Sequence, residues 1–184
     1  MNEATDVVVR DTQRWLECAV IGLNLCPFAK SVHVKGRIHY AVSAAADSRQ
    51  LLAELALEVD ELVAMDVRAR DTTLLIAPHC LGDFLDFNAF LARAGALIRK
   101  RGLEGVIQLA SFHPAYQFAG SDADDVANCT NRSPYPTLHL LREASIERAV
   151  QAFPQAETIY EANVRTLERL GHDGWNALDV GPSA

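Results

Sequence analysis

Several features that mark common protein classes are scarce in this sequence of 184 residues. Its four cysteines (Cys18, Cys26, Cys80 and Cys129) form no C-x-x-C pair and no zinc-finger spacing. No apolar run reaches the ~18 residues that a membrane helix needs. Residues 1–15 carry acidic side chains early and contain no continuous apolar segment, so we expect no secretory signal. These absences favour a cytoplasmic protein with reduced thiols.

Common catalytic and nucleotide-binding signatures are missing as well. The sequence has no G-x-x-x-x-G-K-[ST], G-x-G-x-x-G, H-E-x-x-H or G-x-S-x-G pattern, and it predicts no particular cofactor. Positive charge is also in deficit, with 17 Lys and Arg against 24 Asp and Glu and a net charge of −7. Such a balance argues against nucleic acids and anionic membranes as partners. A small-molecule ligand is the expected partner, an anionic one if a local basic site exists.

The composition that remains is that of a packed globular protein. Apolar residues make up 49% and charged residues 22% of the chain, which is too apolar for a disordered segment. The length matches one domain, so we expect a single domain over residues 1–184.

Hydrophobic periodicity predicts helices and strands in alternation. Asp47 and Asp83 are expected to cap two of the helices, and Pro154 is expected to separate the last two. Helices are predicted over 12–25, 47–65, 83–101, 145–153 and 156–170, and strands over 37–43, 72–77, 105–112 and 137–142. This order indicates an α/β fold, with a small mainly parallel sheet, βαβ crossovers, flanking helices and a long loop over 113–136.

In open parallel sheets, ligands bind beyond the carboxyl ends of the strands. His79 and Cys80 follow the second predicted strand, and His113 follows the third. The loop after His113 would bring further polar residues to the same edge: Tyr116, Asn131 and Arg132. The sequence therefore predicts a polar site at this edge.

The cysteines differ in what their positions favour. Cys18 is on the apolar side of a predicted helix, so we expect it to be buried. Cys26 comes where that helix stops at Pro27, and it is open between a structural thiol and a reactive one. Cys129, in the long loop, has no expected role.

The histidines divide in a similar way. His33, His39 and His172 have no supporting residues around them and are expected to lie at the surface or to be structural. His113 and His139 are open between a functional and a structural role. Within a strand over 137–142, His139 and Arg142 would point to opposite faces, so both line one pocket only if the strand bulges or ends early.

Four stretches of the sequence resemble a bacterial family known as domain of unknown function 1415. They are GLNLCPFAK (22–30), SFHPAYQFAG (111–120), NRSPYPTLHLLREASIERAV (131–150) and LGHDGW (170–175), in matching order over nearly the whole chain. The resemblance implies a free-standing domain of this size and supplies no activity, substrate or cofactor. Cys26, His113, Tyr116, Asn131, Arg132 and His139 fall within the matching stretches. Cys80 and Cys129 do not, which favours Cys26 as the functional thiol.

The first hypothesis is an enzyme that acts on a small anionic substrate. Cys26 would be the nucleophile or redox thiol, with His113 or His139 as the acid–base group, because a nearby imidazolium favours the reactive thiolate. Arg132 would anchor the substrate, since a guanidinium binds a carboxylate or phosphate through two hydrogen bonds. Further substrate contacts are expected from Tyr116, Asn131 and Arg142.

Two alternatives remain open from the sequence. In one, the protein binds a small ligand or a metal without turnover, with Cys26, His113 and His139 as a Cys-His-His zinc set. In the other, the long loop is an interaction surface, and its histidines and arginine make structural hydrogen bonds.

Overall fold

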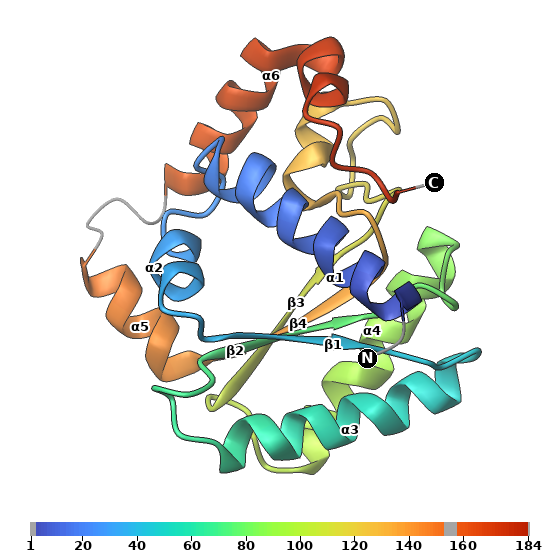
Figure 1. Cartoon of the computed structure of the whole chain (residues 1–184), viewed down its shortest axis with the longest axis vertical. Helices are drawn as coiled ribbons and strands as arrows, with labels where there is room; N and C mark the ends of the chain where they lie inside the picture. The colour runs from blue at the N-terminus through green and yellow to red at the C-terminus, as the bar shows by residue number, and fades with distance from the viewer. Residues whose placement is uncertain (1–2, 153–157, 184) are drawn as a thin grey trace.

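A four-stranded mixed sheet organises the chain, whose residues 3–152 and 158–183 are described by a computed structural model (Figure 1). The strand order is β1-β2-β4-β3. β1 and β2 are parallel, whereas β4 pairs antiparallel with both β2 and β3. The strands are β1 (Ile38–Val42), β2 (Thr72–Ile76), β3 (Ile107–Phe112) and β4 (Thr137–Arg142).

The prediction of a mainly parallel sheet is therefore wrong. All five residues of β2 are buried, so this strand takes the interior of the sheet, with a neighbour on each side. The second neighbour is β4, and the connection from β3 to β4 is the long loop with no α-helix. Antiparallel strands need no crossover helix between them. This connection therefore allows β4 to pair antiparallel with β3.

The helices begin largely where their capping residues predict. Asp47 accepts hydrogen bonds from the backbone of Arg49 and Gln50, and Asp83 does the same for α4, as expected. The elements are α1 (Glu3–Trp15), η1 (Leu16–Ile21), α2 (Ala29–Val34), α3 (Ser48–Ala64), α4 (Phe84–Lys100), η2 (Val126–Asn131), α5 (Glu143–Ala152) and α6 (Ile159–Ala177). The predicted break at Pro154, with residues 153 and 156 beside it, lies outside the described residues.

The first helix differs from its prediction at both ends. It starts at Glu3 rather than near Thr12, and from Leu16 it widens into the π-helical turn η1. Gly22 ends that turn, where a Cβ atom would collide with the carbonyl oxygen of Cys18. Cys18 is exposed, so the prediction that it is buried is wrong: widening a helix shifts which side chains share its inner face.

Helices cover both faces of the sheet, as Figure 1 shows. α3 and α4 pack on one face, where their buried side chains meet Leu138 and Leu140 of β4. α1 and η1 cover the other face, where the ring of Trp15 meets that of Phe112 edge-on at 5.0 Å between centroids. His139 lies on this second face, because side chains alternate along a strand.

α6 forms an outer layer, away from the sheet. Its Leu167 packs against Leu25 and Cys129, so it covers η2 and the turn after η1 (Figure 1). Gly171 interrupts α6 with a φ of 66°, a left-handed conformation that favours glycine. The loop between β3 and β4 is thus held between the end of the sheet and α6.

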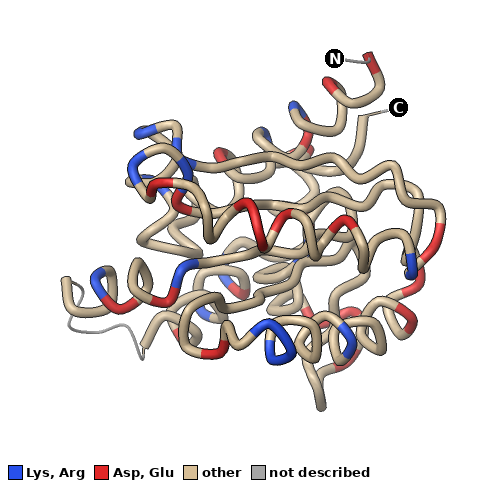
Figure 2. The backbone as a smooth tube through the Cα atoms, turned by 90° about the horizontal axis from the view of Figure 1, so that it is seen from below, with Lys and Arg blue, Asp and Glu red and all other residues tan. Residues whose placement is uncertain are grey.

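Charged residues of both signs are interspersed along the helices, as Figure 2 shows. In the part of the chain that the structure describes, no helix is long and apolar enough to span a bilayer.

Candidate functional site

A pocket of about 230 Å³ lies where three of the quoted stretches of sequence meet. Pro114 contributes from the end of β3, Arg132 and Ser133 from the loop before β4, and His172 and Trp175 from the last turns of α6. The C-terminal segment 180–182 closes the remaining side. The fourth stretch touches this site indirectly, because Cys26 belongs to the same apolar cluster as Trp175.

Arg132 is the cation of this pocket. Its Nε donates to the carbonyl oxygen of Tyr116 at 3.3 Å and its Nη2 to that of Ala123 at 2.8 Å. No carboxylate of the described residues lies within ion-pair distance of the guanidinium. The backbone is fixed too, because Trp15 donates from Nε1 to the Arg132 carbonyl at 2.7 Å. Arg132 thus presents a positioned and unneutralised positive charge.

The three loop residues predicted to bind substrate do come together. The side chain of Asn131 contacts that of Tyr116, and it also donates to the carbonyl of Ser111 at 3.2 Å. Burial raises the pKa of Tyr116, while its hydrogen bond with Asn131 acts in the opposite direction. Neither residue lines the pocket itself. They support the loop that carries Arg132.

The C-terminal wall of the pocket is tied down by a buried carboxylate. Asp11 of α1 accepts hydrogen bonds from the Tyr135 hydroxyl at 2.7 Å and from the backbone N–H of Ser183 at 2.8 Å. Although burial alone would raise it, these bonds hold the pKa of Asp11 below its ordinary value. Arg14 adds a bond from Nη2 to the carbonyl of Gly181 at 2.8 Å. The wall is therefore attached to α1 by hydrogen bonds.

His113 is placed as a structural residue. Its side chain is fully buried between Phe84 and Phe87, at 5.4 and 5.0 Å between ring centroids. Nε2 donates to the Leu81 carbonyl and Nδ1 accepts from the Ala115 N–H, each at 3.0 Å. Burial lowers the pKa of His113 and outweighs the bond to Leu81. Both ring nitrogens are occupied by backbone, so neither is left for acid–base chemistry.

His139 lies in the middle of the sheet, on the opposite face. Its Nε2 is 2.7 Å from the hydroxyl oxygen of Thr72, which itself donates to the Leu140 carbonyl at 2.6 Å. Burial lowers the pKa of His139 to about 4. The ring is therefore neutral near pH 7, and it packs beside Phe112. Its surroundings do not suit it to activate a thiol by positive charge.

Cys26 has the opposite of a nucleophile's surroundings. Its side chain packs against the apolar cluster that contains Trp15 and Leu16. Burial raises the pKa of the thiol, and the backbone N–H groups of Phe28 and Ala29 only partly offset this effect. Burial of this kind disfavours the thiolate. The structure does not bring Cys26, His113 and His139 together as a catalytic set.

The same three residues do not form the zinc set of the alternative hypothesis. Among the residues that the structure describes, no group of three or more His, Cys, Asp or Glu side chains is placed to hold a metal ion. All four cysteines are free thiols. The prediction of a Cys-His-His site is wrong, because His113 and His139 lie on opposite faces of the sheet.

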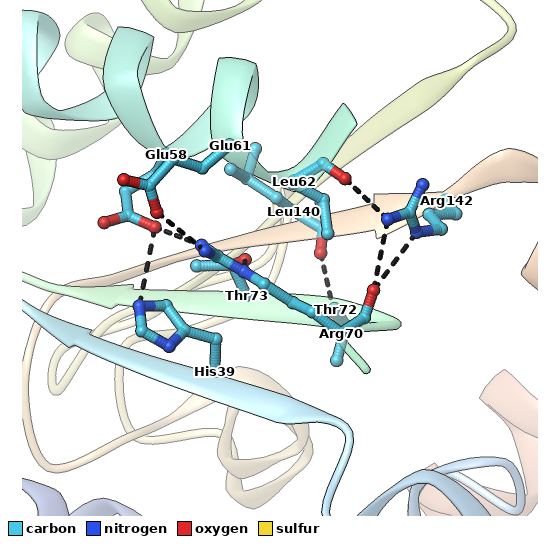
Figure 3. Close-up of polar contacts among 9 residues, drawn as sticks. All are labelled: His39, Glu58, Glu61, Leu62, Arg70, Thr72, Thr73, Leu140 and Arg142. Carbon is cyan, nitrogen blue, oxygen red and sulfur yellow. Dashed lines mark hydrogen bonds and ion pairs between the residues drawn. The ribbon is translucent and has the colours of Figure 1, made fainter. Parts of the chain in front are cut away.

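Arg142, predicted as a substrate contact, does not line the Arg132 pocket and makes its hydrogen bonds within the protein. At the end of β4 its guanidinium donates to three carbonyls in the last turn of α3 and the loop after it: Leu62 at 2.5 Å, Met65 at 2.7 Å and Arg70 at 3.1 Å. Figure 3 shows this group beside the buried Arg70, which pairs with Glu58 and Glu61. This edge of the sheet is closed by interactions within the protein.

A second hollow, of about 450 Å³, lies between the first turns of α3 and α4. Asp47, Cys80, Asp86 and Arg93 line it. Arg93 donates from Nη1 to the hydroxyl of Ser48 at 3.0 Å, and two carboxylates share the hollow with it. Burial, and then nearby carboxylates, raise the pKa of Cys80. The acidic side chains make this hollow less suited to an anion than the Arg132 pocket.

His172, Trp175 and Asn176 line the Arg132 pocket, and none of them was predicted as a site residue. The available signal was the LGHDGW stretch itself, where a glycine interrupts a helix just before a histidine. The predicted helix end at residue 170 hid this arrangement, since the chain turns at Gly171 and continues helically to Ala177.

Comparison with known proteins places the chain in a family. No curated protein and no solved structure shows a significant match to it. A family model does match residues 7–177, which include all four of the quoted stretches. The chain therefore belongs to the family described as "Protein of unknown function (DUF1415)".

Proposed function

We propose that this protein binds a small anionic ligand in the Arg132 pocket. The observation that carries the proposal is the guanidinium of Arg132, which lines a pocket and has no carboxylate partner among the described residues. In a chain with a net charge of −7, carboxylates are plentiful, so a cation held away from all of them suits an external anion. Bonds to Tyr116 and Ala123 position this cation in advance.

The contacts support ligand binding without a reaction at Cys26. The thiol is partly buried with a raised pKa, and the two candidate histidines use their ring nitrogens within the fold. A cytoplasmic setting in a bacterium, proposed from the sequence, fits the four free thiols.

The test compares two arginine substitutions that remove the same charge. Arg132→Gln should abolish binding of inorganic phosphate, sulfate and acetate to the full chain, followed by tryptophan fluorescence because Trp175 lines the pocket. Arg165→Gln is the control, since this exposed arginine of α6 makes only a 3.6 Å pair with Glu161. It should bind these anions as the unmodified protein does. Equal loss in both variants would reduce the effect to net charge and refute the proposal.

A further inference from the structure

We infer that the Arg132 pocket selects a phosphate group over acceptor-only anions such as sulfate or a carboxylate, with His172 as the residue that distinguishes them. This inference rests on the proposed function and names the class of its ligand. The inference follows from the hydrogen bond that His172 makes within the protein, because this bond occupies one ring nitrogen and leaves the other without a partner among the described residues.

His172 and Arg132 are attached side by side to one loop. Nε2 of His172 is 2.8 Å from the carbonyl oxygen of Asp124, and Nη2 of Arg132 is 2.8 Å from that of the preceding residue, Ala123. A carbonyl oxygen only accepts, so Nε2 carries the hydrogen. In the neutral ring Nδ1 is then left with a lone pair, and it has no hydrogen-bond partner among the described residues.

The chain just before the two carbonyls is held by a buried amide. Asn128 is fully buried, and its Oδ1 accepts from the N–H of Phe118 at 3.0 Å and from the hydroxyl of Ser121 at 2.8 Å. Its Nδ2 donates to the carbonyl of Asp122 at 2.8 Å. These bonds fix the chain directly before residues 123 and 124. The cation and the ring acceptor are therefore placed before any ligand arrives.

This pair matches an anion that can donate a hydrogen bond as well as accept several. A phosphate monoester loses its last proton near pH 6, whereas the inorganic phosphate dianion still carries one P–OH group after its second ionisation. This P–OH group can donate to Nδ1 of His172 while the other oxygens of the dianion accept from Arg132. Sulfate and acetate bring acceptors alone, and each would meet the lone pair of Nδ1 unfavourably.

The experiment titrates the full chain with inorganic phosphate, sulfate and acetate at about pH 8, above the ordinary imidazole pKa of about 6.5, and follows tryptophan fluorescence. Inorganic phosphate should bind roughly tenfold more tightly than sulfate, which is the effect of one hydrogen bond to a charged group. His172→Gln keeps a donor for the Asp124 carbonyl and lacks Nδ1. In this variant phosphate and sulfate should bind within about twofold of each other.

Asp173→Asn is the matched control, because it changes the charge of the next residue and leaves the imidazole in place. It should alter phosphate and sulfate affinity alike and preserve their ratio. Equal binding of sulfate and phosphate by the unmodified protein, or a preference that survives His172→Gln, would overturn the inference while anion binding at Arg132 stands. Absence of any anion binding by the unmodified protein would overturn both.

Discussion

Arg132 in the loop before β4 and Arg142 at the end of β4 differ in one respect of their surroundings that decides their roles. Among the described residues Arg142 donates only to backbone carbonyls, next to an Arg70 that is neutralised by Glu58 and Glu61 (Figure 3). Arg132 also donates to carbonyls, but it lines a pocket and has no neutralising carboxylate among the described residues. At the Arg142 end of the sheet the charged groups are paired within the protein, whereas at the Arg132 end a positive charge is left for a ligand.

The largest effect on the free energy of unfolding is expected at Arg70, at the Arg142 end of the sheet. Its side chain is 5% exposed and donates to Thr73 at 2.9 Å as well as to Glu58 and Glu61. Arg70→Met would leave a largely buried carboxylate without its counter-ion, so we expect the free energy of unfolding to fall by about 3–5 kcal/mol. Urea unfolding measures this. Arg68→Met, at an exposed neighbour, should change it by less than about 0.5 kcal/mol.

Equal losses in the two variants would mean that the buried pairing contributes nothing specific. The contrast between the two ends of the sheet would then lose its energetic basis.

The next largest effect is on the pH dependence of stability, and it is expected at His139 in the middle of β4. Its pKa in the fold is about 4, against about 6.5 for an unfolded chain. The unfolded state therefore binds more protons between these values, and stability must fall as pH decreases from about 6.5 to 4, by roughly 3 kcal/mol in total. His139→Gln keeps a donor for Thr72 and does not titrate. Its unfolding free energy should lack this component of the pH dependence, and curves that stay parallel to those of the unmodified protein would contradict the placement.

Local signals explain which parts of the fold could be predicted. The capped helices α3 and α4 and the strand bounds of β2 and β4 follow from periodicity and side-chain caps within short windows. The position of β4 between β2 and β3 depends on pairing between residues far apart, which no local pattern encodes. The only clue was negative: residues 113–136 contain no crossover helix.

The same distinction explains the candidate site. Tyr116, Asn131 and Arg132 come together because one loop carries them. His113 lies apart from His139 because it follows Phe112, whose ring faces α1, so alternation turns it toward α4. His172 reaches the pocket only through the packing of α6 on η2, which the sequence could not predict.

A smaller loss of stability is expected at Arg142. Arg142→Leu removes the hydrogen bonds to the carbonyls of Leu62, Met65 and Arg70, which would then lack protein partners for these bonds. We expect a loss of about 2 kcal/mol in urea unfolding. Arg148→Leu, which removes an exposed contact with Ser145, should cost less than about 0.5 kcal/mol. Phosphate affinity should be unchanged in both variants, and a loss of affinity in Arg142→Leu would restore this residue as a ligand contact.

The smallest effect on stability is expected at Arg132. Its substitution should, however, abolish the stabilisation of the folded protein by phosphate. Arg132→Gln removes two hydrogen bonds to partly exposed carbonyls, so unfolding without ligand should become easier by only about 1 kcal/mol. Phosphate at about ten times its Kd should stabilise the unmodified protein by about 1.4 kcal/mol, because only the folded state binds it. Arg142→Leu should retain this gain and Arg132→Gln should lose it, measured by urea unfolding with and without phosphate. If instead Arg132→Gln keeps the gain, the charge left unpaired at this end of the sheet does not serve a ligand, and the two ends differ only in how the protein satisfies them.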